Sequence, residues 1–209
     1  MKKGIIFDLD GTMWDATYSL VKPWNDAIKL FDEVNLTITR EDLAGFMGKT
    51  IAEIGMVMAP DIELNRRNEM MTTGAVMGNE YLKTHGGILY PNLESTLKIL
   101  KQKYHISIVS NCLDGYIQAF MSYHHLEQYF DDFECQSTGL SKGENIKNVI
   151  ERDNIDKAIY VGDTVGDFNA ASFAGIPFIH AAYGFGGHIP NVPKISKFSD
   201  LPDVAEKYL

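Results

Sequence analysis

The chain has 209 residues, of which 45% are hydrophobic and 22% are charged, and its formal net charge is −9 at neutral pH. These values are typical of a globular protein and exclude disordered, collagen-like and coiled-coil classes. Because the chain is acidic and has no run of Lys and Arg, we expect it to bind neither nucleic acid nor an anionic membrane surface.

The cysteines and the apolar segments indicate the compartment. Cys112 and Cys135 are the only cysteines, too few for a disulfide scaffold, and they fit a reducing environment. The apolar run over 5–7 ends at Asp8, so it is too short for a signal peptide. No stretch approaches the roughly 18 apolar residues of a membrane span. We therefore expect a cytoplasmic protein with no membrane partner.

The first part of the chain predicts one strand followed by helices. A strand is predicted over 4–9, because a strand buried on both faces reads as a continuous apolar run. Apolar residues then recur at helical spacing over 20–31, and capping boxes predict helix starts at Thr39 and Thr50. A longer helix is predicted over 61–83, ending before Gly86.

The second part alternates strands and helices. The predicted strands are 106–109, 133–135, 158–161 and 176–179, and the predicted helices are 92–103, 114–124, 142–153 and 167–174. This alternation predicts an α/β fold with a parallel, doubly wound core sheet. Because the helical block 14–88 interrupts the series, we predict a core domain of residues 1–13 and 89–209 and an inserted α-helical cap domain of residues 14–88.

Polar residues follow four of the predicted strands, at the end where ligands bind in open α/β sheets. They are Asp8, Asp10 and Thr12 after the first strand, Ser110 and Asn111 after the second, Lys142 after the third, and Asp163 and Asp167 after the fourth. Four carboxylates against one lysine repel one another unless a cation lies among them or a proton is bound. Oxygen ligands and a phosphorylated ligand favour Mg²⁺ as that cation.

These segments resemble the four motifs of the haloacid dehalogenase superfamily. The motifs are Asp8-Leu9-Asp10-Gly11-Thr12, Ser110-Asn111, Lys142 and Gly162-Asp163-Thr164-Val165-Gly166-Asp167. Their order and spacing match those of the superfamily motifs, and the helical insert resembles the first cap type of the superfamily. Tyr90-Pro91-Asn92, Ala174-Gly175-Ile176-Pro177 and Tyr183-Gly184-Phe185-Gly186 look most like phosphoglycolate phosphatase-like members.

The resemblance implies a role for each of these residues. Asp8 would be the nucleophile that forms an aspartyl-phosphate, and Asp10 would be the general acid and base. Mg²⁺ would bind Asp8, Asp163 and the main-chain carbonyl of Asp10. Lys142 would neutralise charge on the phosphate and on Asp8.

The remaining residues of the motifs would serve the phosphate or Lys142. The hydroxyls of Thr12 and Ser110 and the backbone N–H of Asn111 would orient the phosphoryl oxygens. Asp167 would hold Lys142 or a metal-bound water, and the alternative is that it only caps the following helix. Lys49, between Gly48 and Thr50, could contact the leaving group from the cap, or could be a solvated surface lysine.

Together these observations favour a Mg²⁺-dependent phosphatase that acts on a small phosphorylated metabolite such as 2-phosphoglycolate, as a monomer or homodimer. The carboxylate of Asp10 favours phosphoryl chemistry, since dehalogenases of this fold lack an acid at its position. A sugar phosphomutase resembling β-phosphoglucomutase shares all four motifs and is the nearest alternative. A catalytically idle phosphate-sensing module is an alternative from another class.

Overall fold

The structure is a computed structural model that describes all 209 residues. A six-stranded sheet with the order β5-β4-β1-β6-β7-β8 forms its centre, and every strand pair in it is parallel. Its strands are β1 (Lys3–Phe7), β4 (His105–Val109), β5 (Asp132–Glu134), β6 (Lys157–Gly162), β7 (Phe178–Ala181) and β8 (Lys194–Ile195). The predicted α/β fold with a parallel, doubly wound sheet is thereby confirmed.

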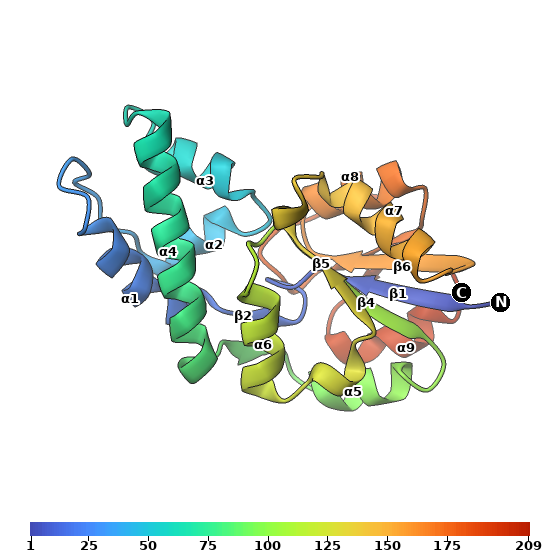
Figure 1. Cartoon of the computed structure of the whole chain (residues 1–209). Coiled ribbons are helices and arrows are strands. Elements are labelled where there is room, and N and C mark those ends of the chain that lie inside the picture. The colour runs from blue at the N-terminus through green and yellow to red at the C-terminus, as the bar shows by residue number, and fades with distance from the viewer.

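Helices cover both faces of this sheet (Figure 1). They are α5 (Leu93–Leu100), α6 (Tyr116–His124), α7 (Lys142–Arg152), α8 (Val165–Ala174) and α9 (Leu201–Ala205), with short 3₁₀ helices at Glu127–Tyr129, Gln136–Thr138 and Phe198–Asp200. In β1, Ile5 and Phe7 join the apolar cluster that includes α5, α6 and α9, whereas Ile6 joins the cluster of α7 and α8. Because successive side chains of β1 point to opposite faces of the sheet, this strand packs against both helical layers.

Each predicted strand differs from the observed one by one or two residues at one or both ends. β1 ends at Phe7, so that Asp8 and Leu9 lie beyond the strand. The last predicted strand, 176–179, is displaced to Phe178–Ala181, since Pro177 has no N–H with which to join a sheet ladder. β8 was not predicted at all, because a strand of two residues has no periodicity to detect.

Residues 17–85 form a helical block at one end of the sheet (Figure 1). Its helices are α1 (Thr17–Ile28), α2 (Arg40–Phe46), α3 (Ile51–Met58) and α4 (Leu64–His85). Thr39 and Thr50 form the capping boxes that begin α2 and α3, as the sequence predicts. α1 and α4 pack closely, since a Cβ added at Gly74 of α4 would lie 2.7 Å from the Trp24 ring.

Two short strands join this helical block to the rest of the chain. β2 (Trp14–Asp15) and β3 (Ile88–Leu89) pair antiparallel, so the chain enters and leaves the block at neighbouring points. The division into a core domain and a cap domain of residues 14–88 stays a prediction. No helix of the structure combines the length and apolar character needed to cross a bilayer.

Candidate active site

The turn after β1 holds the first two carboxylates. Asp8 follows the buried strand directly and is itself buried. Gly11 continues the turn with φ of +79°, a conformation that glycine adopts without strain. A Cβ at Gly11 would lie 2.3 Å from Asp163 Oδ2, so this glycine also lets the turn approach the end of β6.

Lys142 links two of the predicted site carboxylates. It is the first residue of α7, and its Nζ donates to Asp8 Oδ1 at 2.7 Å and to Asp167 Oδ1 at 2.6 Å. All three groups are buried. Burial opposes the charge on Lys142, but the two carboxylates raise the pKa of its ammonium above the ordinary value. Lys142 is therefore held as a cation beside Asp8.

Asp167 both caps α8 and binds Lys142, the two alternatives that the sequence left open. Its Oδ2 accepts from the N–H and the hydroxyl of Thr164 in the capping box that begins α8. Its Oδ1 accepts from Lys142. The capping box thus fixes the carboxylate so that its second oxygen faces the lysine.

Asp163, after β6, has one carboxylate oxygen that accepts hydrogen bonds and one that has no hydrogen-bond partner. Its Oδ2 accepts from the backbone N–H of Phe185 at 2.6 Å and of Gly186 at 3.1 Å. Its Oδ1 is buried and has no hydrogen-bond partner. A buried carboxylate oxygen without a donor is costly, and a cation would satisfy it.

The carboxylates gather as a cation site requires. Ligand atoms of Asp8, Asp163 and Asp167 all lie within 4.8 Å of one another, and all three side chains are buried. Burial, followed by the charge of Asp167, raises the pKa of Asp8 to about 6 although Lys142 opposes the shift. Oxygen donors and surplus negative charge fit a hard divalent cation. The structure therefore contains a set of residues that could hold a divalent metal.

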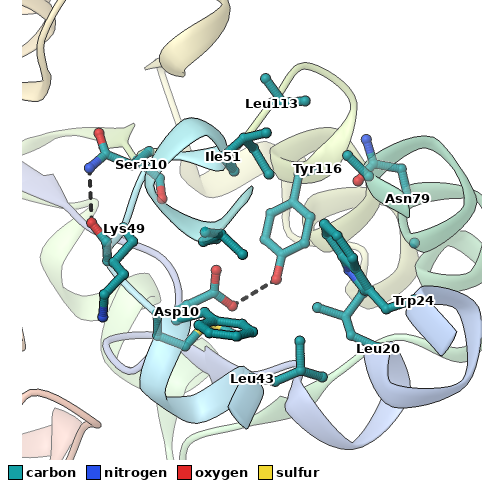
Figure 2. Close-up of a pocket in the computed structure, with 18 of the residues that line it drawn as sticks. Asp10, Leu20, Trp24, Leu43, Lys49, Ile51, Asn79, Ser110, Leu113 and Tyr116 are labelled. Atoms are coloured by element: carbon teal, nitrogen blue, oxygen red, sulfur yellow. Dashed lines mark hydrogen bonds between the residues drawn. The ribbon is translucent and has the colours of Figure 1, made fainter. Parts of the chain in front are cut away.

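The carboxylate of Asp10 points elsewhere. Its Oδ1 accepts from the hydroxyl of Tyr116 at 2.8 Å (Figure 2). Burial raises the pKa of Asp10 to about 7, and the hydrogen bond from Tyr116 limits the rise. A carboxyl group with a pKa near neutrality can both give and take a proton at that pH.

Tyr116 was missed by the sequence analysis. It lies in the predicted helix 114–124, where an aromatic residue looks like ordinary core packing. Only its position in space relates it to Asp10, 106 residues earlier in the chain. No local sequence signal could have identified it.

Three residues predicted to bind phosphate lie near the carboxylates, but their contacts differ. Ser110 and Asn111 line the same pocket as Asp8 and Asp10. The Thr12 hydroxyl is buried without a hydrogen-bond partner, and Thr12 does not line this pocket. The Asn111 side chain donates to Gly48 O at 2.9 Å, which is a contact with the helical block.

Lys49 lines the same pocket as Asp8 and Asp10, but its Nζ bonds to neither carboxylate. Its side chain is exposed, and its Nζ donates to the main-chain carbonyl of Gly45. In Figure 2 it lies on the side of Asp10 away from Trp24 and Asn79. Lys49 does line the pocket, so a role in substrate binding stays a prediction.

One pocket of about 90 Å³ joins the carboxylates to the helical block. Its floor includes Asp8, Asp10, Ser110 and Asn111. Its walls come from α1 to α4 and from α6, and they include Leu20, Trp24, Leu43 and Tyr116 (Figure 2). A group bound at Asp8 would therefore extend between the sheet and the helical block.

Comparison with known proteins agrees with this arrangement. The family model of haloacid dehalogenase-like hydrolases matches residues 5–181. The chain therefore belongs to this family of enzymes, as its motifs predict.

Within the family, the chain is similar to proteins named phosphoglycolate phosphatase. The plasmid-encoded phosphoglycolate phosphatase of Cupriavidus necator is 26% identical over 191 residues, which cover 88% of this chain and 82% of the relative. That of Pasteurella multocida is 26% identical over 223 residues, covering 90% and 89%. The solved structure of a haloacid dehalogenase-like hydrolase from Bacteroides fragilis matches with a TM-score of 0.83 at 21% identity, covering 96% of this chain and 100% of that one.

Proposed function

We propose that this enzyme hydrolyses small phosphomonoesters in the presence of Mg²⁺, through an aspartyl-phosphate formed on Asp8. The observation that carries the proposal is the position of Lys142, which contacts Asp8 and Asp167 beside the unpartnered Asp163 Oδ1. Phosphoryl transfer depends mainly on positioning and on neutralising charge, and these residues supply both. The names of the relatives suggest 2-phosphoglycolate as one substrate of this class.

Asp8 acts as the nucleophile in the first half of the reaction. Lys142 holds Asp8 Oδ1, and Oδ2, which Lys142 does not contact, attacks the phosphorus. The bond from phosphorus to the ester oxygen breaks, and Asp10 donates a proton to that oxygen. The alcohol leaves, and the phosphoryl group remains on Asp8.

Asp10 acts as a base in the second half. It takes a proton from a water molecule, whose oxygen attacks the phosphorus and releases the carboxylate of Asp8 together with inorganic phosphate. Ser110 and Asn111, which line the pocket with Asp8 and Asp10, would orient the phosphoryl oxygens in both halves, together with the unpartnered Thr12 hydroxyl. Mg²⁺, bound by Asp8, Asp163 and the Asp10 carbonyl, would neutralise charge on the phosphoryl group.

The test is phosphate release from a panel of esters that includes p-nitrophenyl phosphate and 2-phosphoglycolate, with Mg²⁺ and with a chelator. We expect turnover that requires Mg²⁺ and falls by about 10²-fold or more in Lys142→Ala, the usual cost of removing an electrostatic catalytic group. Lys147→Ala, at an exposed position of the same helix, is the matched control and should keep its activity.

Full turnover after removal of divalent metal would contradict the metal requirement. Transfer of the phosphoryl group to a sugar phosphate in preference to water would contradict hydrolysis and favour a phosphomutase. Absence of turnover on every ester would contradict an enzymatic role on phosphomonoesters altogether.

A further inference from the structure

The pocket above Asp8 has a mainly apolar lining. Twelve of its 20 lining residues are hydrophobic. Side chains from all four helices of the block contribute, and those that face the pocket include Leu20, Trp24, Leu43, Ile54, Met58 and Ala75. Figure 2 shows Leu20, Trp24 and Leu43 gathered near the Tyr116 ring, on the route from Asp10 into the block. The part of a substrate beyond the phosphate would meet this surface.

No arginine is available to bind an anionic group in this pocket. None of the four arginines of the chain lines it. Each is bound elsewhere: Arg40 to Asp15, Arg66 to Glu33 and Glu69, Arg67 to the carbonyls of Ala59, Pro60 and Ile62, and Arg152 to Asp132 and Glu134.

One lysine lines the pocket, and a second lies at its phosphate end. Lys142 is held by Asp8 and Asp167 and belongs to the phosphate end of the site. Lys49 is the one lysine that lines the pocket, and its Nζ is bonded to Gly45 O at the exposed side. The walls around Trp24 and Leu43 therefore carry no positive charge.

A single neutral polar side chain stands at the far end of the pocket. The Asn79 Nδ2 donates to the carbonyl of Asp114 at 2.8 Å, and no group in the structure donates to its Oδ1. Asn79 could accept one hydrogen bond from a ligand but could not neutralise a carboxylate. An ionised group that loses its water in such a pocket without a partner binds poorly.

We infer that, given the proposed function, this pocket binds the leaving group of phosphomonoesters whose alcohol is uncharged and mainly apolar. The cavity of about 90 Å³ is smaller than the roughly 150 Å³ that holds a benzene molecule, which favours a short branched chain as that alcohol. Esters whose alcohol carries a carboxylate are poorer substrates.

The experiment compares isobutyl phosphate with 2-phosphoglycolate on the full-length protein with Mg²⁺. The two esters share one skeleton, in which two methyl groups replace the two carboxylate oxygens, so shape is held nearly constant while charge changes. We expect kcat/KM to be at least about tenfold higher for isobutyl phosphate, because a pocket without a partner discriminates against a charged group.

A pair of variants on one helix tests whether the apolar wall is responsible. Ile54→Lys places a cation in the pocket wall, whereas Met56→Lys places one at an exposed position of the same helix, outside the pocket. Ile54→Lys should lower the ratio of kcat/KM for isobutyl phosphate over 2-phosphoglycolate by about tenfold or more. Met56→Lys should leave that ratio within about twofold of the parent protein.

The outcomes separate this inference from the proposed function. Turnover in which 2-phosphoglycolate equals or exceeds isobutyl phosphate would overturn the inference and leave the phosphatase function intact. An equal change of the ratio in both lysine variants would also overturn it, because the effect would then come from the added charge alone and not from its position in the pocket wall. No turnover on any ester would overturn the proposed function, and the inference with it.

Discussion

Two aspartates that are two residues apart in the chain have different surroundings and therefore different chemistry. Asp8 faces Lys142 at 2.7 Å, whereas Asp10 faces the Tyr116 hydroxyl at 2.8 Å. Burial raises the pKa of both carboxylates, but the charge of Lys142 opposes the rise at Asp8, whose pKa is about 6, whereas the Tyr116 hydroxyl opposes it at Asp10, whose pKa is about 7. The sequence predicts both roles through the motif, but only the structure shows what enforces the difference.

Tyr116→Phe removes the hydroxyl that positions Asp10 while keeping the ring. We expect kcat to fall by about tenfold, the cost of one hydrogen bond to a charged group, with thermal stability nearly unchanged. The loss should be larger for an alkyl phosphate than for p-nitrophenyl phosphate, because the poorer leaving group depends more on protonation by Asp10. Tyr123→Phe, at an exposed position of the same helix, is the control. Equal losses on both esters would mean that Tyr116 does not act through Asp10.

At the level of elements, polar side chains at helix and strand ends decide where the catalytic residues lie. Capping boxes begin α7 at Ser141 and α8 at Thr164, and they fix the helix starts that carry Lys142 and Asp167. Such boxes are local in sequence, which is why those at Thr39 and Thr50 could be predicted. Short strands such as β8 have no comparable local signal and were missed.

At the opposite end of the sheet, Asp131 supports the start of β4. It accepts from the Ile106 N–H at 2.9 Å and pairs with Lys101 at 2.5 Å. Burial raises the pKa of Asp131, but the Lys101 and Ile106 donors outweigh burial and lower it below the ordinary value. A lowered pKa stabilises the fold above the pKa of the unfolded chain, about 3.9, and that stabilisation is lost as pH falls through the folded value.

Asp131→Asn should therefore lower the free energy of unfolding by about 1–2 kcal/mol at pH 7, as expected for hydrogen bonds to a charged group. The difference from the parent protein should shrink as the pH falls below the ordinary aspartate pKa of about 3.9, because Asp131 then takes up a proton. Urea unfolding as a function of pH measures it, with Asp61→Asn at an exposed site as the control. A difference that stays constant with pH would show that the charge of Asp131 is not responsible.

Over the whole molecule, the site lies between two parts that touch through few polar contacts. Asn111 donates to Gly48 O, Gln136 accepts from the Ile51 N–H at 3.3 Å, and Asn79 donates to Asp114 O. The carboxylates of the candidate site at Asp8, Asp10 and Asp163 could be predicted because they follow strands that are readable from their apolar runs. The pocket could not be predicted, because four helices of the block contribute to its walls and no local sequence pattern indicates how those helices pack.

The position of the Lys49 side chain could not be predicted from the sequence either. Its position between Gly48 and Thr50 suggested a residue that reaches the leaving group, but the sequence carries no information on where its Nζ points. In the structure that nitrogen is bonded to Gly45 O. Specificity in this fold depends on such long-range placement, whereas the phosphoryl chemistry depends on residues at strand ends.

The central claim is that the phosphoryl group passes through Asp8. The most direct measurement is rapid acid quench of the enzyme during a single turnover of a ³²P-labelled ester, followed by peptide mapping by mass spectrometry. We predict transient label on the peptide that contains Asp8, and no label in Asp8→Asn, whose neutral amide is a poor nucleophile. Turnover at the full rate with no phosphorylated Asp8 at any time, or normal turnover by Asp8→Asn without deamidation, would contradict the account.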